Sequence, residues 1–269
     1  MTTQLEKANR LKGLHESGVF VIPNPWDVGS AKIMEGLGFQ ALATTSSGFA
    51  YTLGRLDGQV TFEEKLDHCR ALAAATSVPI SADLENMFAH DPESVAKKLK
   101  LAAETGIVGG SIEDYDGEKI YDFNHAVERV QAAVEAAKSL DFPFGLTARS
   151  ENLIRNVIDL DDTIRRLQAF EAAGASVLYA PGLKTLEDVK LVVESVSKPV
   201  NVLISTMADR ATTVEQLVET GARRISVGGA MAHIAYGSLI RDGDETLEHG
   251  SFNWLNHLST GRKIGSLLG

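Results

Sequence analysis

The sequence has one cysteine, no long uninterrupted apolar segment and fewer basic than acidic side chains. Cys69 is the only cysteine among 269 residues, which excludes an intrachain disulfide and a cysteine-rich metal site. No window approaches the ~18 consecutive apolar residues that a membrane-spanning helix needs, and the first residues form no apolar signal region. A net charge of −10 disfavours nucleic-acid binding. We therefore expect a soluble cytoplasmic protein.

Cysteine and histidine give no sign of a thiol nucleophile or a zinc site. Cys69 lies in an Ala-rich helical segment, where a small core residue is expected. The seven histidines show no paired spacing of the HxH or HExxH kind, so zinc is not indicated.

Short apolar, β-branched segments recur along the chain, with amphipathic helical segments between them. The predicted strands are 19–24, 41–47, 79–85, 109–114, 144–150, 176–182, 199–205 and 223–229. Eight strand–helix units in this length favour an α/β fold of the (β/α)8 TIM barrel type. A doubly wound open sheet is the alternative.

No linker divides the chain, so we predict a single barrel domain over residues 1–269. Residues 242–269 are less regular and form a C-terminal extension. Phe252 and Trp254 lie close together in it, which predicts that the extension packs on another surface.

Polar side chains gather at the predicted carboxyl ends of the strands, where barrel enzymes place their chemistry. They are Asp83 and Glu85 after the third strand, Glu113 after the fourth, Arg149 after the fifth, Asn201 in the seventh, and Asp57 in the loop after the second. Two like charges ~4 Å apart cost roughly 4 kcal/mol at an effective dielectric of ~20. Such carboxylates would either protonate or recruit a cation. Oxygen ligands beside an anionic substrate suit Mg²⁺, with Mn²⁺ as a second possibility.

Helix capping is the competing interpretation of these acids. Capping is favoured for Asp27, just before a predicted helix, and both interpretations stay open for Asp114. Asp83, Glu85 and Glu113 exceed what capping needs, so we favour a functional role for them.

Segment 44–49, TTSSGF, leads from the second strand into a predicted loop. Its serine and glycine amides could cradle a carboxylate or phosphate, although the same residues make ordinary turns. Arg149 is expected to clamp a substrate carboxylate, because a guanidinium inside a barrel mouth needs an anionic partner.

With these positions in place, the sequence resembles the isocitrate lyase/phosphoenolpyruvate mutase superfamily over about residues 19–239. The resemblance rests on the order of NPWDVGSA, TTSSGFA, SADLEN, SIEDYD, TARSEN, VLYAPGL, PVNVLIS and RRISVGGA. It implies a barrel whose C-terminal helix swaps between subunits of a homodimer or homotetramer. It also implies Mg²⁺, a small anionic 2-oxo acid substrate, and a bond broken next to the carbonyl through an enolate.

The resemblance also implies roles for individual residues. The implied metal ligands are Asp83, Glu85 and Glu113, the catalytic residues are Asp57, Glu113 and Arg149, and the substrate-binding residues are Ser46, Ser47, Gly48, Arg149 and Asn201. Asp83 would be the principal ligand, and the other acids, Asp57 included, would hold metal-bound water. Many relatives have Asp at the position of Glu85.

One departure from the family argues against lyases of the isocitrate and methylisocitrate kind. Lyases for isocitrate and methylisocitrate carry an acid–base Cys in a loop after the fourth strand, and here that loop, YDGEKIYDFNHAVERV, has none. We expect a Mg²⁺-dependent lyase or hydrolase that cleaves a C–C bond of a small 2-oxo acid or dicarboxylate. The alternatives are a phosphonopyruvate hydrolase or phosphoenolpyruvate mutase, which act on a P–C bond, and a 2-oxo acid binding protein with little turnover.

Overall fold

The computed structural model describes residues 2–268, in which eight parallel strands form one sheet in the order β1-β8-β7-β6-β5-β4-β3-β2. The strands are β1 (Phe20–Ile22), β2 (Leu42–Ala43), β3 (Ile80–Ala82), β4 (Gly109–Glu113), β5 (Gly145–Arg149), β6 (Val177–Tyr179), β7 (Val200–Leu203) and β8 (Arg224–Ser226). The Ala43 amide donates a 3.0 Å hydrogen bond to the Pro23 carbonyl across the seam between β1 and β2. This nearly closed barrel confirms the (β/α)8 prediction over the open sheet.

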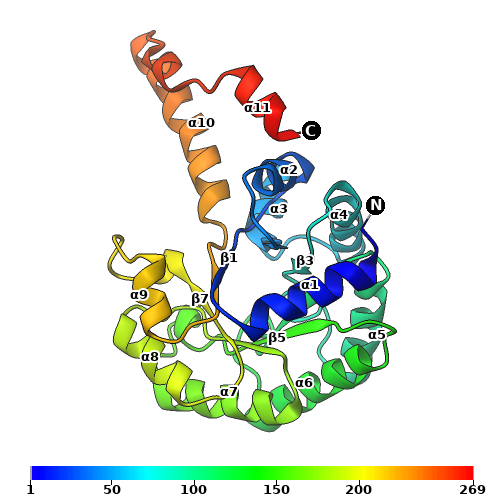
Figure 1. The fold of residues 1–269 in the computed structure, drawn as a ribbon. Helices are drawn as coiled ribbons and strands as arrows, with labels where there is room; N and C mark the ends of the chain where they lie inside the picture. Colours follow the sequence, from blue (N-terminus) through cyan, green and yellow to red (C-terminus); the bar gives the residue numbers. More distant parts are fainter. Residues whose placement is uncertain (1, 269) are drawn as a thin grey trace.

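Helices precede, connect and follow the strands, and those between consecutive strands surround the barrel (Figure 1). They are α1 (Gln4–Glu16), α2 (Val28–Gly36), α3 (Ser46–Thr52), α4 (Phe62–Ala75), α5 (Pro92–Ala103), α6 (Phe123–Lys138), α7 (Leu160–Ala173), α8 (Leu186–Glu194), α9 (Val214–Glu219), α10 (Ala230–His249) and α11 (Gly261–Leu268), with short 3₁₀ turns at Leu153–Arg155, Ile204–Thr206 and Asn253–His257. In residues 2–268, no helix has the length and apolar character needed to cross a membrane.

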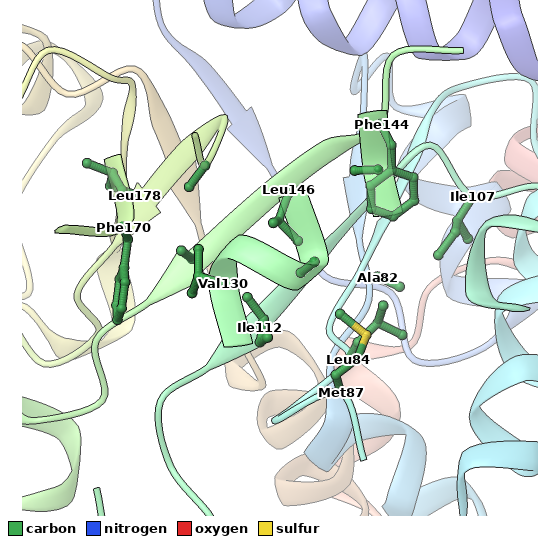
Figure 2. Close-up of a cluster of buried hydrophobic side chains, with 14 of the residues drawn as sticks. Ala82, Leu84, Met87, Ile107, Ile112, Val130, Phe144, Leu146, Phe170 and Leu178 are labelled. Atoms are coloured by element: carbon green, nitrogen blue, oxygen red, sulfur yellow. The ribbon is translucent and has the colours of Figure 1, made fainter. Parts of the chain in front are cut away.

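Side chains alternate along the strands between the helical shell and the barrel interior. Ile112 of β4 and Leu146 of β5 belong to a buried cluster with Val130 of α6 (Figure 2). Their neighbours of the other parity, such as Ser111 and Arg149, line a cavity inside the barrel. The strands therefore stabilise the fold with one face and present polar groups with the other.

The amino-terminal end of the barrel is covered by α1. Ala8 and Leu11 of this helix pack on Phe20, Ala41 and Val108, which lie at or just before the starts of strands. The loops and the cavity lie at the opposite end, which is formed by the carboxyl ends of the strands.

The chain leaves the barrel through α10, which projects away from it before α11 returns beside α2 (Figure 1). Helix α10 continues without a break through residues 242–249, so the irregular part begins later than the predicted boundary at 242. Trp254 donates to Thr246 near the end of α10 and lies edge-on to Phe252. Packing of this extension on a second subunit stays a prediction.

Candidate active site

A cavity of about 180 Å³ opens among the carboxyl ends of the strands. Its lining includes the predicted residues Ser46, Ser47, Asp83, Arg149 and Asn201. An adjoining hollow of about 380 Å³ is lined by Asp57, Glu85 and Glu113, and Ser46 lies on both. The structure thus brings every predicted site residue to this end of the barrel, although Gly48 lines neither space.

Arg149 is the charged centre of the site. Its Nη1 lies 3.3 Å from Asp83 Oδ1 and 2.9 Å from Glu113 Oε1, and its Nη2 lies 2.9 Å from Glu151 Oε1. The ring of Tyr179 packs 4.9 Å from the guanidinium carbon. Burial opposes the charge, but the three carboxylates raise the pKa of Arg149 well above its ordinary value. Sequence reasoning assigned Arg149 to a substrate carboxylate and gave Glu151 no role, although its two-residue spacing placed it near Arg149.

The carboxylates differ in how easily they ionise. Burial works against the charge of Asp83, yet Arg149, Lys65 and two backbone N–H groups keep its pKa below the usual range. Burial raises the pKa of Glu113 well above its ordinary value, despite Arg149. Burial also raises the pKa of Glu85 to about 7, with Lys65 opposing the shift. The site therefore holds more buried negative charge than its cations balance.

Lys65 of α4 reaches the site from behind the barrel wall. Its side chain is fully buried, and Nζ lies 3.7 Å from Glu85 Oε1. Neither of these two atoms has a hydrogen-bond partner among the described residues. A lysine in a helix gives no sequence signal for such a position, so sequence reasoning missed it.

The loop that carries Glu85 is strained. Glu85, Met87 and Phe88 have φ values of 52°, 63° and 51°, a left-handed region that costs non-glycine residues about 1–3 kcal/mol each. Arg129 of α6 stabilises the loop because its buried guanidinium donates to the carbonyls of Asn86, Ala89 and Glu113. The strain is thus placed beside the acidic cluster.

The segment after β2 is a helix rather than the predicted loop. The Thr45 side chain accepts the Gly48 amide and so begins α3. The Ser46 amide donates to Asp83 Oδ2 at 3.2 Å. Within residues 2–268, the Gly48 amide is used for capping, whereas Ser46 and Ser47 face the cavity.

Three further predictions concern residues outside the cluster. Asp27 caps α2 through the Ser30 amide, as expected. Asp114, left open from the sequence, accepts the Glu151 amide and pairs with Arg166, so it supports the loop after β5. Cys69 is fully buried, as predicted, and burial raises its thiol pKa to about 12.

The loop after β4 is a compact turn. Tyr115 and Ile120 form an antiparallel bridge, and the Asp116 carboxylate accepts the amides of Glu118 and Lys119. Tyr121 is buried, with its hydroxyl 2.6 Å from His90 Nδ1. Tyr115, Asp116 and Gly117 of this turn line the acidic hollow.

The acids fit an oxygen-ligated divalent ion that keeps much of its water. The orphaned Oε1 of Glu85 and the raised pKa values of Glu85 and Glu113 indicate a shortage of positive charge. In residues 2–268, no three His, Cys, Asp or Glu side chains converge closely enough to hold an ion by themselves. Mg²⁺ typically takes only one or two carboxylates directly and completes its shell with water.

Comparisons with known proteins place the whole site inside a matched region. Residues 11–247 match the family model described as phosphoenolpyruvate phosphomutase. A solved structure from Burkholderia cenocepacia J2315, provisionally named a lyase/mutase, is 44% identical, with TM-score 0.94, and the match covers 97% of this chain and 95% of that one. The 2-methylisocitrate lyase of Halalkalibacterium halodurans is 26% identical over 208 residues, which are 73% of this chain and 67% of the relative. Phosphonopyruvate hydrolase, solved with oxalate and Mg²⁺, shares the fold, with 21% identity, TM-score 0.84, and coverage of 99% and 95%.

Proposed function

We propose a function from the family to which the chain belongs, the phosphoenolpyruvate phosphomutase family of the isocitrate lyase/PEP mutase superfamily. The protein is a Mg²⁺-dependent lyase or hydrolase that cleaves a C–C bond next to the carbonyl of a small 2-oxo acid or dicarboxylate. The relatives named above act on small acids of this kind according to their names.

The observation that carries the proposal is the buried acidic cluster around Arg149. Asp83, Glu113 and Glu151 share Arg149. Arg155 also lies 3.8 Å from Glu113 and 3.3 Å from Glu151. Glu85 lies 3.7 Å from Lys65 without a hydrogen bond to it. Buried like charges repel strongly, so this arrangement favours a cation and, beside it, an anionic ligand that Arg149 can also contact. Asp83 would be the principal ligand, because its pKa keeps it ionised. Glu85, Glu113 and Asp57 would hold the ion's water.

Bound Mg²⁺ would act as a Lewis acid toward the 2-oxo group. Residues of the protein bind the substrate and balance its charge. Ser46 and Ser47 bind the carboxylate of the 2-oxo acid portion, and Asn201 contacts the rest of the substrate in the cavity. The bond that breaks joins C3 to the departing group. That group leaves as CO2 or, after its hydroxyl proton passes to a carboxylate of the cluster, as a carbonyl compound, and its bonding electrons stay behind in an enolate. Arg149 balances the negative charge that grows on the 2-oxo oxygen. The hollow beside the short turn after β4 admits water, which supplies the proton.

P–C bond cleavage is the second candidate function. A phosphonate needs cations beyond Arg149. Arg55 is paired at 2.8 Å with Glu64 on the protein surface, whereas Arg224 lines the cavity. The binding-protein alternative rests on the missing loop cysteine, and turnover measurements separate it from an enzyme.

The metal assignment is tested by thermal unfolding with and without Mg²⁺. We expect Mg²⁺ to raise the Tm of the wild-type protein, because an ion at 100 times its Kd stabilises the folded state by about 2.7 kcal/mol. Asp83→Ala should abolish this shift. Asp91→Ala is the matched control, since Asp91 caps α5 on the surface, and it should keep the shift. An undiminished Mg²⁺ shift in Asp83→Ala would refute the metal assignment.

A further inference from the structure

Arg224 of β8 is a buried cation without a counter-ion. Its side chain lines the active-site cavity, yet the residue is only 5% exposed. Nε donates to Asn201 Oδ1 at 2.7 Å and Nη2 donates to Thr147 Oγ1 at 3.1 Å, and both acceptors are neutral. Among the described residues, no carboxylate lies within 4.0 Å of its guanidinium.

The other arginines with little exposure are compensated differently. Arg149 is surrounded by carboxylates, and Arg166 pairs with Asp114 and Asp162. Arg129 donates to three backbone carbonyls and stacks on a tyrosine ring, and it is not among the residues that line the cavity. Arg224 alone of these four combines an uncompensated charge with access to the cavity.

The charge of Arg224 persists at neutral pH. Burial lowers its pKa to about 10, with Tyr179 opposing the shift and Arg149 adding to it. A buried guanidinium without an anion is costly, because water no longer solvates it. An anionic ligand in the cavity would remove this cost.

The groups around Arg224 also favour an anion. The Asn201 carboxamide is oriented between Arg224 and Ser226, to which its Nδ2 donates at 2.9 Å. Burial raises the pKa of Tyr179 to about 12, so its hydroxyl stays a hydrogen-bond donor. Tyr179 and Ser226 line the same cavity as Arg224.

We propose that Arg224, with Asn201, Tyr179 and Ser226, forms a subsite for a second anionic group of the substrate. The 2-oxo acid portion of the substrate is bound by Asp83, Arg149 and the serines of α3. The carboxylate at the other end of the substrate is bound by Arg224. Arg224 is therefore the residue that selects dicarboxylates over monocarboxylates. This inference rests on the proposed function and specifies its substrate class.

The test compares two acids that differ by one carboxylate, malate and lactate, by calorimetry in Mg²⁺. The wild-type protein should bind malate at least about tenfold more tightly than lactate, because hydrogen bonds to charged groups are among the strongest in proteins. Arg224→Gln should lose most of this preference while lactate affinity changes less than about twofold. Arg223→Gln is the matched control, because Arg223 is the exposed neighbour that donates to the Gly18 carbonyl.

Arg224→Lys keeps the charge and should retain part of the malate preference, which provides a second variant if Arg224→Gln folds poorly. Equal loss of malate and lactate affinity in Arg224→Gln, or a wild-type protein without preference for malate, would overturn the inference. Failure of both acids to bind the wild-type protein in Mg²⁺ would instead overturn the proposed function.

Discussion

Consecutive residues of α4 show how burial sets the charge of a side chain in this protein. Burial lowers the pKa of His68 to about 3, helped by the nearby Lys65, while it raises the thiol pKa of Cys69 to about 12. The His68 ring stacks on Phe49 with centroids 3.8 Å apart. His68 and Cys69 are therefore neutral at pH 7. They contribute to the packing of α4 on the barrel rather than to the chemistry of the active site.

The neutral state of His68 predicts acid sensitivity. An unfolded histidine titrates near 6.5, so between pH 6.5 and 3 the unfolded state binds more protons than the folded state. The contribution of His68 to stability is complete above pH 6.5 and is lost as the pH falls, by up to about 1.4 kcal/mol per pH unit. Urea unfolding at pH 7, 6 and 5 should therefore show a shallower pH dependence for His68→Gln than for the wild type.

The matched control is His249→Gln, because His249 is exposed at the end of α10. Its unfolding free energy should follow the wild-type pH dependence. If His68→Gln also follows the wild type, His68 is protonated equally in the two states and the burial argument is wrong.

At the same scale, the sequence indicated some site residues and not others. Asp83, Glu113 and Arg149 were predictable because parity along a strand decides which side chains face the interior. Lys65 and Arg224 were not, because their roles depend on distances across the barrel that no local pattern encodes.

The start of α2 was predicted from the sequence, because Asp27 caps it by accepting the Ser30 amide. Thr61 and Asp91 begin α4 and α5 in the same way. Segment 44–49 was the exception, because its Ser and Gly residues are typical of loops and α3 is only seven residues long. The tertiary contact of Ser46 with Asp83 helps to fix this short helix in place.

The close approach of α2 and α11 predicts an effect of a single methyl group. A Cβ at Gly36 would lie 2.7 Å from the Leu267 carbonyl oxygen, so Gly36→Ala should displace α11 and cost about 1–3 kcal/mol of its packing. Trypsin should then cleave faster at Arg262 and Lys263. Gly13→Ala is the control, because a Cβ there meets nothing within 4 Å. Equal cleavage of the two variants would contradict this packing of α11.

On the scale of the whole molecule, the eight-unit pattern was enough to predict the barrel, because each strand–helix unit repeats the same local signal. The same pattern could not predict how far α10 extends. The mixture of polar and apolar residues in α10 is compatible with a helix that packs on the barrel or on another surface. Leu239, Ile240 and Leu247 of α10 are largely exposed in the single chain. Such a row of apolar side chains is costly unless another surface covers it.

We therefore predict that the protein is a homodimer or homotetramer whose contacts include α10. Light scattering after size-exclusion chromatography should give a multiple of the 28.9 kDa chain mass. Ile240→Glu should shift the mass toward that of one chain, whereas Leu191→Glu, on the exposed face of α8, should not. A monomeric wild-type protein at micromolar concentration would contradict the prediction.

The most direct test of the proposed function is product formation with Mg²⁺ and with EDTA. The candidates are oxaloacetate, 2-methylisocitrate, isocitrate, 2,3-dimethylmalate and, for the P–C alternative, phosphonopyruvate. We predict cleavage of at least one of the carboxylic acids in Mg²⁺, with loss of cleavage in EDTA and in Asp83→Ala. Cleavage that survives EDTA, cleavage of phosphonopyruvate alone, or binding without any product would contradict a Mg²⁺-dependent C–C bond-cleaving enzyme.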